Sequence, residues 1–263
     1  MFKLAFQDLS SAFKMNELSL SLAWTEVRLK YIRTKIGPFW ETLSLAILLF
    51  TLAVLWSKLW KIEINEYLPH LVSGMIIWRY MALIITDGCL IFTRHDYIFK
   101  SVPMPFSVLV IKHIYAGIFL FLHHLPIIII FNLILKIDFI SINLFYLIYS
   151  VPIFLITSYS AIIILAITST RFRDIHSLTA SLVSVLVFFT PIFWTIDQMG
   201  ETGRKYFVTP NIVYHYIEIF RKPLIGHSPN FFSVIFTFIF TILIFIFSMY
   251  LLNKYKKRII FWI

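Results

Sequence analysis

The sequence predicts an all-α integral membrane protein with six transmembrane helices. Three observations support this fold class: a hydrophobic content of 60% with only 14% charged residues, six long stretches with almost no charge, and an uneven distribution of basic residues between the segments that join them. A water-exposed surface requires more charge than this chain carries. The single cysteine, Cys89, cannot form an intrachain disulfide.

An amphipathic helix is predicted over residues 20–35, within an N-terminal segment that covers residues 1–41. Its apolar side chains recur at spacings of 4, 3 and 4 residues and its charged side chains project elsewhere; these two sets are Leu20, Trp24, Val27 and Tyr31, and Glu26, Lys30 and Arg33. Such a helix either lies on the membrane surface or docks a partner, and the pattern leaves both open. Gly37-Pro38 is expected to end it and to turn the chain into the bilayer.

Six stretches with almost no charge are each about long enough to span a bilayer, whose hydrocarbon core of about 30 Å needs roughly 20 helical residues. They are residues 43–60, 67–85, 106–135, 140–168, 178–196 and 231–252. Residues 42–263 are therefore predicted to form one six-helix transmembrane domain.

The basic residues indicate how these spans are oriented. With the N-terminus in the cytoplasm, the inside segments hold fourteen Lys and Arg residues and the outside segments hold seven. Because positive residues concentrate in cytoplasmic loops, both termini are expected in the cytoplasm. This bias explains most of the net charge of +10 without a nucleic-acid partner.

Two segments between the spans are too long for tight turns. Residues 86–105 lie on the predicted cytoplasmic side, and their mixed charges favour a short helix that contacts a soluble partner. Residues 197–230 lie on the outer side and contain an amphipathic helix that Pro223 and Gly226 end. Its two faces are formed by Val213, Tyr216, Ile217 and Phe220, and by His215, Glu218, Arg221 and Lys222. We expect this helix to lie in the membrane interface or to re-enter the membrane against protein or a wet cavity.

Four polar side chains within the predicted spans are candidates for a site. Arg79 lies deep in the second span, where snorkelling towards the headgroups and a ligand role are both open. Lys112 is nearer the inner surface, which favours snorkelling. His123 and His124 point about 100° apart on a helix, so they cannot readily share one metal ion, and neutral hydrogen-bonded histidines are favoured.

Several enzyme classes are excluded by missing motifs. The sequence has no G-x-x-x-x-G-K-[ST] run, no dinucleotide-binding fingerprint and no H-E-x-x-H. Its acidic residues stand at span ends or in loops, not at the buried positions that ion-coupled carriers use. We therefore expect no catalytic residue, no metal site and no cofactor on this chain.

Four blocks of sequence occur in order along the predicted spans. They are Gly37-Pro38-Phe39-Trp40, Arg171-Phe172-Arg173-Asp174-Ile175, Thr190-Pro191-Ile192-Phe193-Trp194, and residues 211–226. Together, from about residue 20 to the C-terminus, they resemble the membrane (permease) subunit of ABC-2-type transporters that export polysaccharides, including O-antigen exporters. One departure is local, because Thr209-Pro210-Asn211-Ile212 stands where the family usually has Asn-Pro.

The resemblance implies a homodimer of six-span subunits, each bound to a separate ABC ATPase subunit that carries ATP and Mg²⁺. The N-terminal amphipathic interface helix and a coupling helix within residues 86–105 would contact the ATPase, with coupling residues Trp24, Arg28, Tyr31, Arg94, His95, Asp96, Arg173 and Asp174. Residues 204–225, within a periplasmic gate region of residues 197–230, would form short re-entrant gate helices, with gate residues Tyr214, Tyr216, Glu218, Phe220 and Arg221.

The implied substrate is a lipid-linked glycan, such as O-antigen on undecaprenyl diphosphate, exported across a bacterial inner membrane. A diphosphate requires basic partners, and the candidates are Arg28, Lys30, Arg33, Arg79 and Lys112. Two alternatives stay open. One is an ABC-2 permease for capsule, teichoic acid, a drug or a small lipid. The other is a membrane acyl- or glycosyltransferase, for which Asp87, His95 and Asp96 are the only approximate catalytic constellation.

Overall fold

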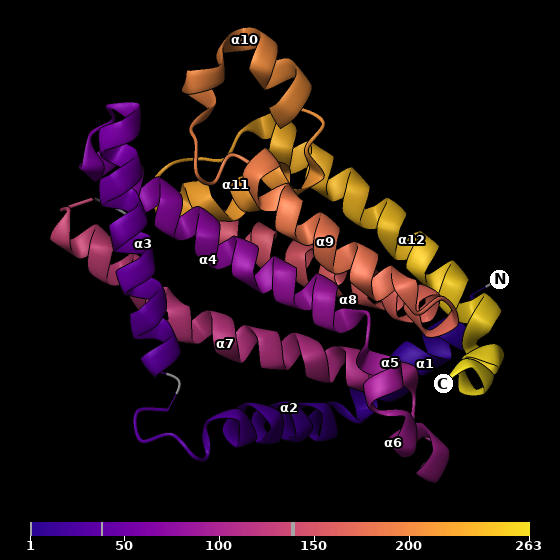
Figure 1. Ribbon diagram of the computed structural model, residues 1–263. Helices are drawn as coiled ribbons and strands as arrows, with labels where there is room; N and C mark the ends of the chain where they lie inside the picture. The colour runs from indigo at the N-terminus through magenta and orange to yellow at the C-terminus, as the bar shows by residue number, and fades with distance from the viewer. Residues whose placement is uncertain (1, 38, 138–139) are drawn as a thin grey trace.

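The fold is known from a computed structural model, which describes residues 2–37, 39–137 and 140–263. Within these ranges all regular elements are helices and no strand occurs (Figure 1). The long helices are α3 (Phe39–Trp60), α4 (Ile64–Gly88), α7 (Phe106–Ile134), α8 (Tyr146–Arg171) and α12 (Phe231–Trp262). The shorter elements are α1 (Lys3–Lys14), α2 (Asn16–Tyr31), α5 (Ile91–Arg94), α6 (Asp96–Ser101), η1 (Ile142–Phe145), α9 (Asp174–Phe189), η2 (Ile196–Met199), α10 (Gly200–Gly203), η3 (Arg204–Val208) and α11 (Ile212–Leu224). The all-α class is confirmed.

Five of the six predicted spans correspond to helices long and apolar enough to cross a membrane. The remaining stretch, residues 178–196, forms the shorter helix α9, whose 16 residues extend about 24 Å. α9 ends where Thr190 adopts an extended conformation, with φ −90° and ψ 137°. A residue before proline favours that conformation, so Pro191 stops the helix. The chain then folds back onto α4, where the Tyr67 hydroxyl donates to the Phe193 carbonyl at 2.5 Å.

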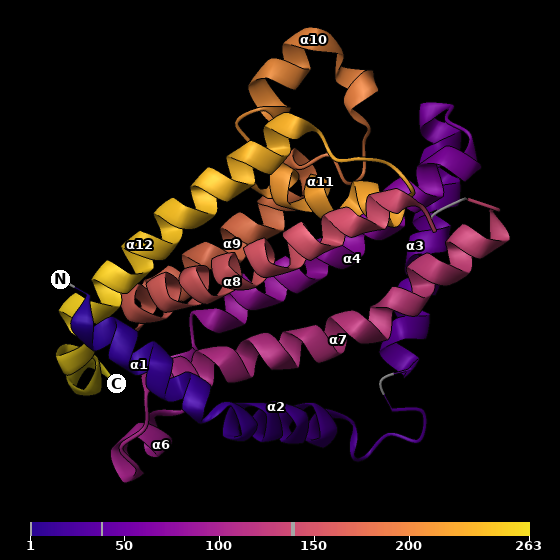
Figure 2. The same cartoon turned by 180° about the vertical axis from the view of Figure 1, so that it is seen from behind.

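Except for α2 and the chain that follows it, the segments predicted to be cytoplasmic gather at one end of the bundle. The two termini, α5, α6 and the turn between α8 and α9 lie together at that end, whereas α10 and the α3–α4 connection lie towards the other (Figures 1 and 2). This arrangement agrees with the predicted alternation of the segments between two sides.

α4 is the central helix of the bundle. In its most apolar stretch 61% of the residues are buried, against 22% for both α3 and α12. It packs against α3, α7, α8, α9 and α11. α7 approaches it closely at Gly117, where an added Cβ would lie only 2.9 Å from the Tyr80 ring. The outer positions of α3 and α12 leave their apolar side chains available to lipid.

α2 lies along the first half of α7, as Figures 1 and 2 both show. Its contact face consists of the small or medium-sized residues Ser19, Ala23 and Val27, and Ser19 Oγ donates to the Val108 carbonyl at 3.2 Å. In the predicted stripe, by contrast, Leu20 and Trp24 are 43% and 54% exposed. Small residues form the contact with α7 because they let the two helices approach closely. Beyond α2, Gly37 has the left-handed φ of +61° that suits the predicted turn; Pro38 lies outside the described residues.

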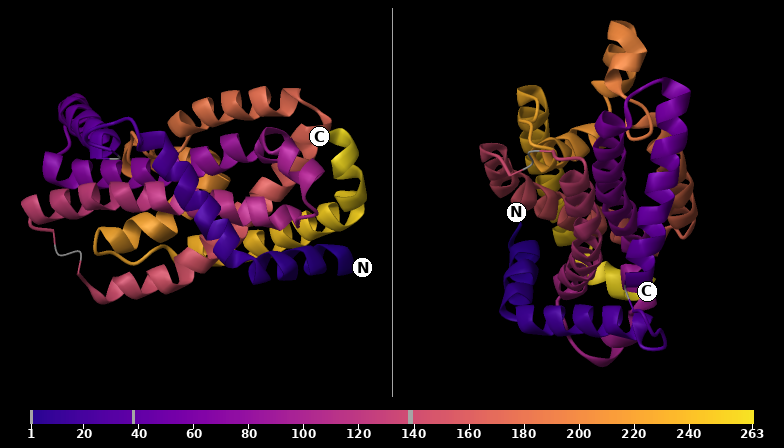
Figure 3. Two further views of the ribbon diagram at one scale, coloured as in Figure 1. Left: turned by 90° about the horizontal axis from the view of Figure 1, so that it is seen from below. Right: turned by 90° about the vertical axis from the view of Figure 1, so that its left-hand side faces the viewer.

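α1 is attached to the bundle by one buried carboxylate. Asp8 accepts hydrogen bonds from the backbone N–H groups of Phe106 at 3.3 Å and Ser107 at 2.9 Å, and it forms an ion pair with Lys256 at 2.9 Å. A side chain from α1 thereby satisfies the first turn of α7 and neutralises a lysine near the end of α12. Figure 3 shows α1 at the end of the bundle where the chain terminates, with α2 running away from that end.

Replacement of Asp8 by Ala should destabilise the protein by about 3 kcal/mol, because it leaves Lys256 and the two backbone donors of α7 without their buried acceptor. The melting temperature of the variant in detergent, compared with that of the wild type, measures this loss of stability. Asp197→Ala is the matched control. Asp197 is 93% exposed, and its ion pair with Arg204 is long, at 3.6 Å. Equal melting temperatures for the two variants would contradict the role assigned to Asp8.

Candidate functional site

The outer block of residues 211–226 forms a helix that is surrounded by protein. α11 begins after Asn211, whose side chain accepts a hydrogen bond from the Tyr214 backbone N–H at 3.0 Å. α4, α8 and α12 pack around it. Its buried residues include the polar side chains His215, Glu218 and Arg221. Of the two placements that the sequence predicts, the structure has the helix packed into the bundle, with its polar face internal.

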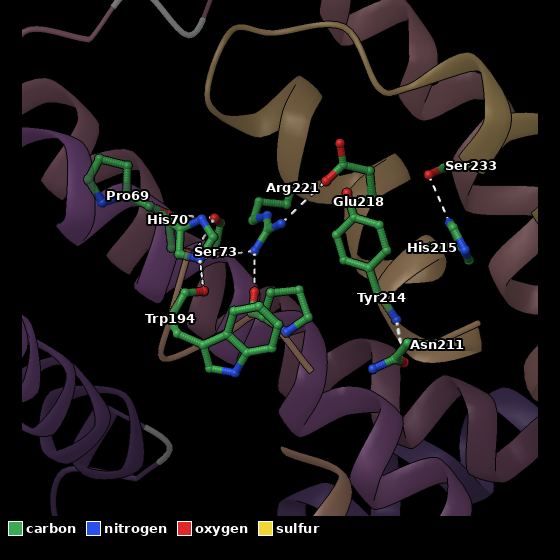
Figure 4. Close-up of polar contacts among 11 residues, drawn as sticks. Pro69, His70, Ser73, Trp194, Asn211, Tyr214, His215, Glu218, Arg221 and Ser233 are labelled. Atoms are coloured by element: carbon green, nitrogen blue, oxygen red, sulfur yellow. Dashed lines mark hydrogen bonds and ion pairs between the residues drawn. The ribbon is translucent and has the colours of Figure 1, made fainter. Parts of the chain in front are cut away.

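Arg221 connects three segments that are distant in the sequence (Figure 4). Its guanidinium donates from Nη1 to the Pro191 carbonyl at 2.8 Å and from Nη2 to Glu218 at 3.3 Å. Nη1 also lies 3.3 Å from Nε2 of His70, a residue of α4 whose Nε2 is 3.2 Å from the Trp194 carbonyl. The side chains of Arg221 and Glu218 are only 2% and 4% exposed. The charge of Arg221 is therefore balanced inside the protein, and α11 is tied to α4 and to the chain after α9.

Two further polar groups attach α11 to its other neighbours. His215 contacts Ser233 of α12 through Nδ1 and the Thr209 carbonyl through Nε2, both at 2.9 Å. The Tyr216 hydroxyl lies 2.7 Å from Thr241 Oγ1 of α12 and 2.9 Å from Thr157 Oγ1 of α8. These hydrogen bonds satisfy buried polar groups in a region that would otherwise offer them only lipid.

All five predicted gate residues are buried on α11. They are Tyr214, Tyr216, Glu218, Phe220 and Arg221. Their role in gating stays a prediction. The sequence analysis missed His70 as a neighbour of Arg221, because no spacing in the sequence links residues 70 and 221. The Pro191 carbonyl, however, belongs to one of the four family-like blocks, which is the signal that could have indicated this contact.

The predicted coupling residues on α5 and α6 form exposed ion pairs and one half-buried contact. Arg94 pairs with Asp87 at 3.1 Å, and Asp96 pairs with Lys100 at 2.8 Å, which lowers the pKa of Asp96 and keeps it ionised. His95 Nε2 lies 3.1 Å from Lys112 Nζ of α7. Burial and the Lys112 charge lower the pKa of His95, so the imidazole is neutral at pH 7 and accepts this hydrogen bond.

The remaining coupling residues lie on other elements. Arg173 and Asp174 are exposed in the turn between α8 and α9, at the same end of the bundle as α5 and α6 (Figure 1). Trp24, Arg28 and Tyr31 lie on α2, where Trp24 makes an edge contact with Phe119 at a ring-centroid distance of 5.5 Å. A contact of any of these residues with an ATPase stays a prediction.

The five residues predicted to bind a diphosphate do not form one cluster. Lys30 and Arg79 both pair with Glu41, at 3.0 and 3.3 Å. Lys112 is buried and pairs with Glu26 as well as contacting His95. Arg28 and Arg33 are exposed side chains of α2 and of the connection that follows it. Arg79 therefore shares a carboxylate with Lys30, a pairing that the sequence did not indicate.

His123 and His124 of α7 do not face a common ligand. His123 Nδ1 is 2.6 Å from the Phe119 carbonyl of its own helix, and His124 is buried. In the part of the chain that the structure describes, no group of three His, Cys, Asp or Glu side chains is arranged to hold a metal ion.

Comparisons with known proteins agree on one kind of protein. The sequence profile of the ABC-2 type transporter family matches residues 18–225. Two curated relatives are O-antigen export system permease proteins RfbA of Klebsiella pneumoniae, which are 19% and 21% identical to this chain over 237 residues. Each comparison covers 89% of this chain and 90% of the relative.

Replacement of Arg221 by Gln should destabilise the protein by about 3 kcal/mol or more, because it leaves the Glu218 carboxylate buried without a counter-charge. The double variant Glu218→Gln/Arg221→Gln should lose less than the sum of the two single variants, which a double-mutant cycle of unfolding in detergent measures. Lys205→Gln, at an exposed lysine of the same region, is the control. Strictly additive losses would show that the pair is not coupled.

Proposed function

This chain belongs to the ABC-2 type transporter family, and from that membership we propose that it is the membrane subunit of an ATP-driven exporter of a lipid-linked polysaccharide. The proposed substrate is O-antigen or a similar cell-surface glycan on undecaprenyl diphosphate, moved across a bacterial inner membrane. The observation that carries this proposal is the similarity over nine-tenths of both chains to the O-antigen export permeases. Membership of the family confirms the resemblance of the four sequence blocks.

ATP hydrolysis is assigned to a separate subunit. The sequence contains no phosphate-binding G-x-x-x-x-G-K-[ST] run, so this chain needs a nucleotide-binding partner to use ATP. We propose a homodimer of this chain with two ABC ATPase subunits, which bind ATP and Mg²⁺. The two-to-one excess of basic residues supports cytoplasmic termini, and with them an ATPase at the end of the bundle that carries α5 and α6.

The exposed ion pairs of α5 and α6 suit a reversible contact with this ATPase. Arg94, Asp87, Asp96 and Lys100 present both signs of charge at the projecting end of the bundle. Exposed pairs of this kind contribute little to stability, so the side chains can exchange intramolecular partners for those of another protein. Motion of the ATPase would then be transmitted along α4 and α7, the helices that flank these elements.

The exporter proposal is tested by co-expression of this chain with a candidate ABC ATPase subunit. We expect a stable complex with two copies of each subunit, in which lipid-linked glycan stimulates ATP hydrolysis. If instead the chain purifies without an ATPase and modifies an added lipid or sugar, the proposal is wrong and the transferase alternative at Asp87, His95 and Asp96 takes its place.

Charge reversal at Arg94 and Asp96 should lower glycan export by about tenfold while the ATPase keeps its basal hydrolysis, because the contact that transmits closure is lost. Export from cells and hydrolysis by the purified complex give the two readouts. The matched control reverses Asp197 and Arg204, an exposed pair at the opposite end. Full export by the Arg94/Asp96 variant would exclude α5 and α6 as the coupling contact.

A further inference from the structure

Two helices, α2 and α4, bring three polar side chains together around Glu41, in the first turn of α3. One carboxylate oxygen accepts from Lys30 at 3.0 Å and from the hydroxyl of Tyr31, both at the end of α2. The other oxygen accepts from Arg79 of α4 at 3.3 Å. A single carboxylate therefore occupies the donors of two cations and one phenol.

The charges of this cluster do not balance. Lys30 and Arg79 contribute two positive charges and Glu41 contributes one negative charge. Their side chains are also accessible, with exposed fractions of 52% for Lys30, 40% for Arg79 and 27% for Glu41. Accessible pairs contribute little to stability, whereas the buried Arg221–Glu218 pair cannot separate without a large penalty. Another anion can therefore replace the Glu41 carboxylate as the partner of Lys30 and Arg79.

The position of the cluster makes accessible charge unusual. Thr42 donates from Oγ1 to the His123 carbonyl at 3.0 Å, so α3 begins beside the middle of α7. His123 follows Phe106, the first residue of α7, by 17 positions, or about 25 Å along the helix axis. Arg79 lies inside the predicted span of α4, and a charged side chain within a span is costly unless it lines a wet path or binds a ligand.

The donors match a phosphate group. An arginine can donate to two phosphate oxygens at once, and a lysine adds a third charge-assisted donor. Burial and the Glu41 carboxylate raise the pKa of Tyr31, so its hydroxyl keeps its proton and remains a donor when the anion changes. The N-terminal turn of α3, which carries Glu41, also favours a negative charge at this point.

We propose that Lys30, Tyr31 and Arg79 form a phosphate subsite for the diphosphate of the lipid-linked substrate, and that Glu41 is an internal counter-ion which the diphosphate displaces. The inference rests on the proposed function, because it takes the substrate to be a lipid diphosphate. In the empty transporter Glu41 neutralises part of the positive charge and joins the start of α3 to the end of α2 and to α4. When the diphosphate enters, it takes over the three donors, and release of the substrate returns them to Glu41.

The test measures the binding of undecaprenyl diphosphate, without a glycan, to the co-purified complex in nanodiscs of zwitterionic lipid. Removal of the competing carboxylate in Glu41→Gln should tighten binding about tenfold, and Arg79→Gln should weaken it by a similar factor. Glu66→Gln is the matched control, because Glu66 is likewise a glutamate in the first turn of a spanning helix. If Glu41→Gln fails to fold, Lys30→Gln at an accessible position should weaken binding and tests the same subsite.

The outcomes separate this inference from the proposed function. Binding of undecaprenyl diphosphate that is equal in the wild type and in the Glu41, Lys30 and Arg79 variants overturns the subsite and leaves the exporter proposal intact. Competition by inorganic diphosphate supports recognition of the phosphates. Competition by phosphatidylglycerol alone assigns the cluster to membrane lipid and overturns the substrate assignment. A complex that neither binds the lipid diphosphate nor is stimulated by lipid-linked glycan fails on both proposals.

Discussion

The outer half of the protein depends on the buried guanidinium of Arg221. Inside a membrane domain no bulk water is available to hydrogen-bond a charge, so each donor needs a protein partner. The Arg221 Nη1 and Nη2 groups find such partners at Glu218 of α11, at the Pro191 carbonyl and next to His70 of α4, whereas its buried Nε has no hydrogen-bond partner among the described residues. These contacts explain how α9 and α11, each too short to span the membrane as a single helix, are held in register with the long helices.

The same constraint acts at the other end of the bundle. Asp8 serves as the acceptor for the first turn of α7 and as the counter-ion of Lys256, so the first and last helices are joined there. Lys112 is buried between α2 and the α5–α6 segment, where it contacts Glu26 and His95. A movement of α5 or α6 would therefore disturb the contacts of both α7 and α2.

The ionic groups of this protein fall into two physical classes. Those of Arg221 and Asp8 are buried and hold elements together, because their separation would leave a charge without a partner. Those around Glu41, Arg94 and Asp96 are accessible and separate at little cost. An ABC transporter has to keep its subunits intact while it exchanges contacts with substrate and ATPase in each cycle. The free-energy cost of such an exchange is lowest at the accessible groups.

The sequence by itself determined the helical class, five of the six predicted spans, the grouping of most segments at two ends, and the family, because these depend on local composition, hydropathy and short motifs. It also located the helix of residues 212–224. Only the tertiary structure decided that Pro191 shortens α9, that Ser19, Ala23 and Val27 form the contact face of α2, and that Glu41 and His70 are the neighbours of Arg79 and Arg221. Periodicity reports which residues share a face of one helix. The partner of a charge is set by packing between helices that lie tens to more than a hundred residues apart, and no spacing within one helix encodes it.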